Sequence, residues 1–199
     1  MFKKFLLLAS AGLMAIGPAV AAEKVKIGFV TTITTPAGVI GKDMVDAVNL
    51  AMEDIGGKMA GLDVELIVED DGFKPAIGKQ KTDKLVKQDK VQFVTGFIWS
   101  HVLLASQKSA LGAGKFLISS NAGPSQMAGK LCHKNFFSTS WQNDQTPMAM
   151  GEVLNLNNVK SLYVMAPNYA AGKNMVAGVT RTFKGKIVGK DLTKWGKDA

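Results

Sequence analysis

The sequence predicts an α/β fold in which parallel sheets are flanked by helices. Three observations carry this prediction: short β-type runs alternate with longer segments of helical period, glycine and proline stand at several junctions, and the alternation begins again after Trp141. We therefore expect two lobes of the same build joined by a crossing segment. The second series holds only two strands, so we expect its lobe to be incomplete in this chain.

The first series begins with a strand at Val25–Val30, and a helix follows at about Lys42–Ile55. That helix is predicted from apolar residues that share one helical face: Met44, Val48, Ala51, Met52 and Ile55. Gly56 and Gly57 then end it, because glycine readily adopts the left-handed conformation that commonly follows a helix.

The second strand is expected at Leu62–Glu69, and Pro75 opens a helix to about Gln88, because proline fits the first helical turn. The first series then continues with a strand at Val91–Thr95, a helix at Val102–Ala113, a strand at Phe116–Ser119 and a short crossing strand at Phe136–Ser140. The second series consists of a helix at Pro147–Leu154, a strand at Ser161–Ala166, a helix at Lys173–Phe183 and a strand at Ile187–Asp191.

The first 21 residues are typical of a secretory signal peptide. Lys3 and Lys4 precede an apolar run at Phe5–Ile16, and small residues lead to Ala21 and Ala22. The run is too short for a membrane-spanning helix. We therefore predict cleavage after Ala21 or Ala22 and a periplasmic protein, with residues 22–142 forming a ligand-binding lobe and residues 143–199 the beginning of the second lobe.

Composition narrows the function classes. The net charge is +8, and it falls to +6, with 22 basic and 16 acidic residues, once the two lysines of the predicted leader are removed. The lysines are interspersed with acids and do not alternate with aromatic residues, so no nucleic-acid partner is expected. Two histidines and one cysteine are too few for a zinc cluster. Cys132 is either an inert buried thiol or has its partner in chain that is not in this sequence.

Four loops that follow strands share one chemistry. They are rich in hydroxyl, amide, glycine and aromatic groups and carry no charge, and they span residues 31–38, 96–100, 119–125 and 167–172. Such loops offer N–H groups, helix N-termini and hydroxyl donors to a small anion. Ordinary turns have a similar composition, but exposed aromatics at Trp99 and Tyr169 favour a ligand site. Trp141 is expected either to pack under the hinge or to line the crevice.

Catalytic motifs are absent from the sequence. There is no phosphate-binding Gly-x-x-x-x-Gly-Lys, no Gly-x-Gly-x-x-Gly and no His-Glu-x-x-His. The segment Gly123–Met127 only half resembles a nucleophile elbow, because Met127 stands where the second glycine belongs. Ser125 is therefore expected to lie in a turn or cap a helix.

The remaining candidates for chemistry also have ordinary explanations. His101 and His133 have no carboxylate beside them in sequence to orient them, so surface or capping roles are expected. Asp70 and Asp71 stand before Gly72 and are expected to form a solvated turn rather than a metal site. We predict no metal, no cofactor and no enzyme activity.

Together, several segments resemble the branched-chain amino acid type of periplasmic substrate-binding protein, which serves an ABC importer. The resemblance covers the mature chain and is carried by Lys26–Val30, Glu69–Asp71, Gly96–Ser100, Ser119–Gly123, Phe137–Ser140 and Asn168–Gly172. It implies the type I periplasmic binding protein fold, similar to leucine-binding protein, in which two α/β lobes joined by crossing strands close on a ligand. Family members are longer, in agreement with an incomplete second lobe.

The resemblance also implies a binding site. Ser100 matches the residue whose hydroxyl and N–H hold the ligand carboxylate, and Asn121 matches the residue whose carbonyl accepts the ligand amino group. Tyr169 matches an aromatic residue of the second lobe that covers the ligand. The predicted ligand-binding residues are Trp99, Ser100, Asn121, Ala122, Gly123 and Tyr169.

Two departures from the family pattern affect the ligand. Gly123 stands where amino-acid binders have a hydroxyl residue, and Ile40 stands where an aromatic residue is often found. The acidic residue that usually holds the ligand ammonium would lie beyond Ala199. An aromatic or aliphatic carboxylate therefore competes with a branched-chain amino acid as the expected ligand.

The predicted function is capture of a small carboxylate by a monomeric solute-binding protein that delivers it to an ABC transporter permease. We expect the first lobe to bind the ligand through Ser100 and residues 121–123, and hinge closure to bring Tyr169 over it. Two alternatives stay open: a secreted α/β hydrolase that uses Ser125 or Ser100, and a ligand-sensing domain of a receptor.

Overall fold

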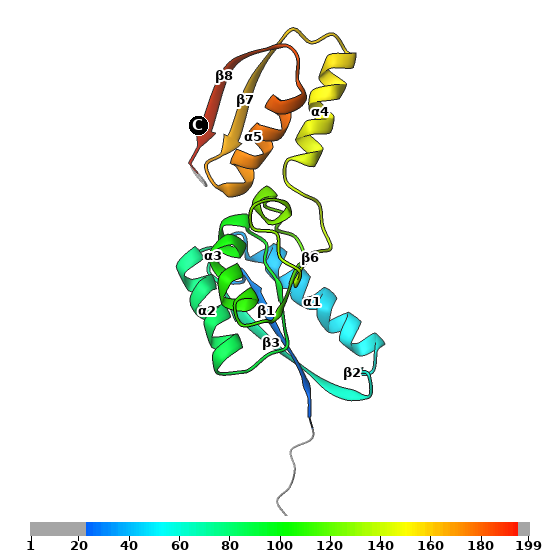
Figure 1. Cartoon of the computed structure of the whole chain (residues 1–199). Coiled ribbons are helices and arrows are strands. Elements are labelled where there is room, and N and C mark those ends of the chain that lie inside the picture. The colour runs from blue at the N-terminus through cyan, green and yellow to red at the C-terminus, as the bar shows by residue number, and fades with distance from the viewer. Residues whose placement is uncertain (1–22, 195–199) are drawn as a thin grey trace, which may run out of the picture.

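The computed structural model describes residues 23–194, which form two α/β lobes (Figure 1). The predicted signal peptide at residues 1–21 lies outside the described residues. We use "first lobe" for the elements from β1 to β6 and "second lobe" for those from α4 to β8. The predicted boundary between residues 142 and 143 falls in the segment that joins β6 to α4, and it stays a prediction.

The first lobe is built on a six-stranded sheet in the order β2-β3-β1-β4-β5-β6. All neighbouring pairs are parallel except β2 and β3, which are antiparallel. The strands are β1 (Val25–Thr31), β2 (Lys58–Met59), β3 (Leu62–Asp70), β4 (Phe93–Gly96), β5 (Phe116–Ser119) and β6 (Phe136–Ser138). The alternation of strands and helices in the sequence thus produces the predicted parallel sheet.

Helices lie on both faces of this sheet (Figure 1). α2 (Pro75–Lys87) and α3 (Ser100–Leu111) pack together on one face, and α1 (Gly38–Asp54) lies on the other. The core lies mainly between the sheet and the α2–α3 pair, and its fully buried side chains include Val30, Leu85, Val94, Val102, Leu103 and Leu117.

α1 is less covered than its apolar pattern predicted. Met44 packs on the core, whereas Ile55, just beyond the helix, is exposed. Leu50 is exposed as well, so within residues 23–194 this face of the first lobe is only partly covered. The helix also begins earlier than expected, at Gly38 rather than Lys42.

The second lobe contains a two-stranded parallel sheet and two helices. Its elements are α4 (Gln145–Leu156), β7 (Ser161–Pro167), α5 (Ala170–Thr182) and β8 (Lys186–Thr193). The helices pack on each other, and α5 also packs on β7. Each of these four elements agrees with the sequence prediction to within a few residues.

Two short elements were not predicted. β2 pairs with β3 through a tight turn in which Ala60 and Gly61 have positive φ angles, and a 3₁₀ turn covers Ser125–Ala128. Cys132 is exposed and makes no disulfide within the described chain, so the alternative of an inert buried thiol is wrong.

Candidate functional site

The carboxyl ends of the parallel strands meet at one edge of the first sheet. Thr31 pairs with Asp70, and Gly96 of β4 pairs with both Val30 and Ser119. β1 lies between β3 and β4, so the loops that follow β1 and β4 leave the sheet at the point where the strand order reverses. Ligands of open α/β sheets bind in the crevice at such a point.

The loop after β4 is shaped by two residues with positive φ. Gly96 has a φ of +99°, and a Cβ there would lie 2.4 Å from the Val30 carbonyl oxygen, so only glycine fits this close approach. Phe97 follows with a φ of +62°, and its N–H donates to the Val30 carbonyl at 2.7 Å. The Phe97 ring is fully buried, which stabilises this unusual conformation and directs the chain into α3.

Trp99 is the N-cap residue of α3 and is 5% exposed, so the prediction of an exposed aromatic is wrong. The indole is buried because its N–H finds a partner inside the protein. Nε1 donates to the Thr32 hydroxyl at 2.8 Å. A buried tryptophan normally needs such an acceptor. The hydrogen bond to Thr32 therefore holds the Trp99 indole in place inside the loop region.

We call residues 139–144, which join β6 to α4, the crossing segment. Ser100 is the first residue of α3 and is buried beside this segment. Its Oγ accepts a hydrogen bond of 2.9 Å from Nδ2 of Asn143. A serine hydroxyl has one hydrogen and two lone pairs, so this contact leaves the hydrogen available to a ligand oxygen. Asn143 was not singled out in the sequence, where it is one of several amides in an uninterrupted polar stretch.

Residues 121–123 form a tightly held loop. Asn121 donates from Nδ2 to the Ile98 carbonyl at 2.9 Å, and the Ala122 carbonyl accepts from the Ser119 hydroxyl at 2.5 Å. A Cβ on Gly123 would lie 1.8 Å from the Trp141 carbonyl oxygen. Glycine is therefore required here by contact with the crossing segment, whatever its role toward a ligand.

Tyr169 is the N-cap residue of α5 and reaches the first lobe. Its ring centroid lies 6.3 Å from that of Trp99 and 5.4 Å from that of His101. Phe73 contacts the same two rings from the other side, at 4.8 and 4.9 Å. We call Phe73, Trp99, His101 and Tyr169 the ring cluster; three of its members come from the first lobe and one from the second.

His101 was expected at the surface or as a cap, and this prediction is wrong. It is half-buried between Phe73 and Tyr169, because the loop after β3 folds over the start of α3. Burial lowers the pKa of His101, against the opposing effects of the Phe73 backbone and the Asp71 carboxylate. Burial also raises the pKa of the Tyr169 phenol, so both rings are uncharged at neutral pH.

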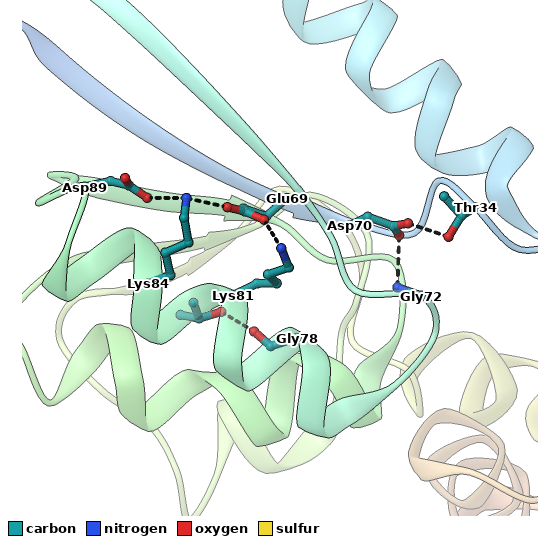
Figure 2. A network of polar contacts seen from close by, with 9 residues as sticks. Thr34, Glu69, Asp70, Gly72, Gly78, Lys81, Lys84 and Asp89 are labelled. Carbon is teal, nitrogen blue, oxygen red and sulfur yellow. Dashed lines mark hydrogen bonds and ion pairs between the residues drawn. The ribbon is translucent and has the colours of Figure 1, made fainter.

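The two adjacent carboxylates after β3 have different surroundings. Asp70 joins two loops, since it accepts from the Thr34 hydroxyl and, at 2.9 Å, from the Gly72 N–H (Figure 2). Asp71 is fully buried, so the expectation of a solvated turn is wrong for it. Burial raises the pKa of the Asp71 carboxyl, although hydrogen bonds from Thr32 and the Phe73 N–H oppose this effect. In the sequence, the one indication of the burial of Asp71 was its position just after the end of a predicted strand.

A cavity of about 210 Å³ lies beside the crossing segment. Gly123, Met127, Phe136 and Trp141 are among its lining residues, whereas Trp99, Ser100 and Tyr169 do not line it. Trp141 is exposed and borders this cavity. Ile40 lies in α1 and is exposed.

Two features are absent from the part of the chain that the structure describes. No three His, Cys, Asp or Glu side chains within residues 23–194 are grouped so as to hold a metal ion. In the same part of the chain, no helix has the length and apolar character needed to cross a membrane.

Comparison with solved structures gives consistent matches. A solute-binding protein of an ABC transporter from Rhodopseudomonas palustris, in complex with benzoate, is 26% identical with a TM-score of 0.82; the match covers 88% of this chain and 49% of that one. A solute-binding protein from R. palustris BisB5, in complex with 3,4-dihydroxybenzoic acid, is 25% identical with a TM-score of 0.79 and coverage of 86% and 47%.

A third match shows the fold alone. The branched-chain amino acid transporter substrate-binding protein of Streptococcus pneumoniae, in complex with isoleucine, is 24% identical with a TM-score of 0.77 and coverage of 88% and 51%. The chain thus spans about half the length of these structures. No curated protein matches the sequence.

The sequence model of the family described as "Periplasmic binding protein" matches residues 24–199, almost the entire chain after the predicted leader. The parallel sheets, the crossing segment and the solved neighbours agree with this match. The chain therefore belongs to the periplasmic binding protein family and has the type I fold of the solute-binding proteins of ABC transporters.

Proposed function

We propose that this chain carries the ligand-binding lobe of an extracytoplasmic solute-binding protein that captures a small carboxylate and delivers it to an ABC transporter permease. In this proposal residues 1–21 direct export to the periplasm, residues 22–142 bind the ligand first, and residues 143–199 begin the lobe that closes over it. The protein acts as a monomer and catalyses no reaction. The family and the solved neighbours are transport binding proteins, which supports this role.

One observation carries the proposal: two helix N-termini, one from each lobe, begin at residues whose rings are in contact. Trp99 is the N-cap of α3 and Tyr169 is the N-cap of α5, and neither helix has a side-chain cap. The first N–H groups of a helix lack partners within it, and together with the helix dipole they favour an anion. A carboxylate is the small anion that these N–H groups and the Ser100 hydroxyl would bind together.

The ring cluster indicates which carboxylates are worth testing first. Phe73, Trp99, His101 and Tyr169 pack against one another, and burial lowers the pKa of His101, so in this proposal the ring cluster forms an apolar wall against which a flat or branched apolar group would lie. The two R. palustris neighbours bind benzoates, whereas the S. pneumoniae neighbour, which supports only the fold, binds isoleucine. We therefore propose an aromatic carboxylate as the first ligand class and a branched-chain amino acid as the second.

The test is a binding measurement on Ser100→Ala. Removing the hydroxyl takes one hydrogen bond from a charged carboxylate, a loss worth about 1.5 to 3 kcal/mol. We expect the dissociation constant for benzoate, measured by isothermal titration calorimetry, to rise roughly tenfold or more, and the thermal midpoint to stay close to that of the wild type.

Ser109→Ala is the matched control, because Ser109 lies in the same helix near its other end. It should bind benzoate as the wild type does. Equal binding by Ser100→Ala and the wild type would contradict the assignment of Ser100. Hydrolysis of a chromogenic ester by the wild type, lost in Ser125→Ala or Ser100→Ala, would instead establish the hydrolase alternative.

A further inference from the structure

The ring cluster rests on a buried chain of hydrogen bonds that sequence reasoning did not anticipate. The Trp99 indole N–H donates to Thr32 Oγ1 at 2.8 Å, and the Thr32 hydroxyl donates to Asp71 Oδ1. Thr32 and Asp71 are both fully buried. An indole nitrogen only donates and a threonine hydroxyl has one hydrogen, so the bonds run in one direction, from Trp99 through Thr32 to Asp71.

The same carboxylate oxygen fixes a second part of the cluster. Asp71 Oδ1 accepts from the Phe73 N–H at 2.8 Å. Phe73 has a φ of +65°, a left-handed conformation that is uncommon for a bulky residue and needs a local interaction to hold it. The Phe73 ring then packs edge-on against Trp99 and contacts His101.

Two buried side chains, Thr32 and Asp71, thus join three strand-end loops. Thr32 follows β1, Asp71 and Phe73 follow β3, and Trp99 follows β4. A carboxyl group without exposure is costly to bury, and Oδ2 of Asp71 has no hydrogen-bond partner among the described residues. An apolar side chain would fill the same space at lower cost, but it could not hold the Thr32 hydroxyl or the Phe73 N–H.

We propose that Asp71 and Thr32 are positioning residues of the ligand site, which hold the Trp99 indole and the Phe73 loop in the arrangement that a ligand meets. This inference rests on the proposed function, because it assigns the ring cluster as the wall of the carboxylate site. Neither residue needs to touch the ligand. Their effect on binding passes through Trp99 and Phe73.

The test compares Thr32→Val with Thr32→Ser. Valine matches threonine in shape but cannot accept from Trp99 or donate to Asp71, whereas serine keeps the hydroxyl. We expect Thr32→Val to weaken benzoate binding, measured by calorimetry, roughly tenfold, and Thr32→Ser to stay within about twofold of the wild type.

A second readout follows Trp99 itself. Hydrogen exchange of its indole N–H, measured by NMR and assigned with Trp99→Phe, should be slow in the wild type and in Thr32→Ser and fast in Thr32→Val. A merely structural role would not change the indole selectively. Asp71→Asn provides a further check, since its amide oxygen can still accept from both Thr32 and Phe73; it should retain slow exchange and binding within about threefold.

The affinity and the indole exchange of Thr32→Val together decide whether Thr32 positions Trp99. Wild-type affinity and slow indole exchange in Thr32→Val would overturn it. A wild type that binds neither benzoate nor isoleucine would overturn the proposed function instead. Indole exchange would then decide alone: fast exchange in Thr32→Val supports positioning of Trp99, and slow exchange refutes it.

Discussion

The two lobes differ in how well their apolar side chains are covered. In the first lobe the fully buried apolar residues form one cluster between the sheet and the α2–α3 pair: Val30, Leu85, Val91, Val94, Phe97, Val102, Leu103, Ala110 and Leu117. Among the described residues of the second lobe, the buried apolar side chains are a small set: Ala166, Ala171, Val179 and Phe183. Large apolar side chains there are exposed within the described chain: Met150, Val153, Leu156, Tyr163, Met165 and Val188.

The candidate site residues are divided between the two lobes in a way that corresponds to this difference in burial. The covered lobe supplies Trp99, Ser100 and the 121–123 loop, each held by hydrogen bonds inside the protein. The less covered lobe supplies Tyr169, whose ring contacts those of Trp99 and His101. In the proposed function, this division gives the site one preformed wall and one wall that moves when the lobes close, and we expect ligand affinity to depend on both.

The largest expected effect separates the two lobes by stability. Leu85 is fully buried in α2 against β1, whereas Leu156 ends α4 and is 81% exposed. We expect Leu85→Ala to lower the free energy of unfolding by about 2 to 5 kcal/mol, because it removes buried apolar contacts and leaves a cavity. Urea unfolding followed by circular dichroism measures this loss.

Leu156→Ala is the matched variant in the second lobe. The same side-chain truncation at an exposed position should change the free energy of unfolding by less than about 0.5 kcal/mol. Equal losses at the two positions would show that Leu156 is covered in solution, and the contrast between the lobes would then fail.

The sequence predicts those parts of the fold that depend on local signals and misses those that depend on tertiary contacts. Strands such as Phe116–Ser119 and helices such as Pro75–Lys87 follow from β-type runs, helical periodicity and an N-terminal proline, all of which are local signals. β2 has only two residues and no periodicity, so it was missed. α1 begins at Gly38, ahead of the predicted start. Gly41 in its first turn lies so close to Thr32 that a Cβ would be 1.9 Å from the Thr32 carbonyl oxygen, and this tertiary contact has no sequence signal.

The candidate site stays a prediction, and the surroundings of its residues were predicted only in part, for a related reason. Trp99, Ser100 and Tyr169 could be selected because strand-end loops rich in aromatic and hydroxyl groups are recognisable in the sequence. Asp71 could not, since a carboxylate before glycine is most often in a solvated turn, whereas Asp71 is buried and accepts from Thr32 of a loop distant in sequence. His101 was assigned to a surface or capping role because no carboxylate stands beside it in sequence, whereas the rings that half-bury it, Phe73 and Tyr169, are distant in sequence.

A smaller effect concerns the second lobe's share of the site. Tyr169→Ala removes the one ring that the second lobe adds to the cluster, and Tyr169→Phe keeps that ring and removes only the hydroxyl. We expect Tyr169→Ala to weaken benzoate binding roughly tenfold and Tyr169→Phe less than about threefold, because an aromatic pair contributes about 0.5 to 1.5 kcal/mol beyond its buried area. Calorimetry decides this, and unchanged affinity in Tyr169→Ala would remove the second lobe from the site.

The smallest expected effect concerns the polar contacts that fasten α2 to the first sheet. Glu69 of β3 is almost buried and pairs with Lys81 and with Lys84, each at 2.7 Å, and Lys84 also contacts Asp89 (Figure 2). We expect Glu69→Gln to cost about 1 kcal/mol of unfolding free energy at pH 7, since the two lysines are partly exposed and solvent weakens the pairs. Asp63→Asn, which removes an exposed pair with Lys58, should leave the unfolding midpoint unchanged.

The pH dependence of Glu69→Gln gives the sharper measurement. Burial alone would raise the pKa of Glu69, but hydrogen bonds and charge from Lys81 and Lys84 outweigh it and lower the pKa below its ordinary value of 4.5. A carboxyl group whose pKa is lower in the folded state stabilises the fold above its unfolded pKa, and this contribution is lost as the pH falls through the folded value. The stability gap between the wild type and Glu69→Gln should therefore be full at pH 7 and shrink below about pH 4. If the difference in unfolding free energy persists at pH 3, glutamine at position 69 destabilises the fold through packing. The charge of Glu69 would then not be what stabilises the contact between α2 and the sheet.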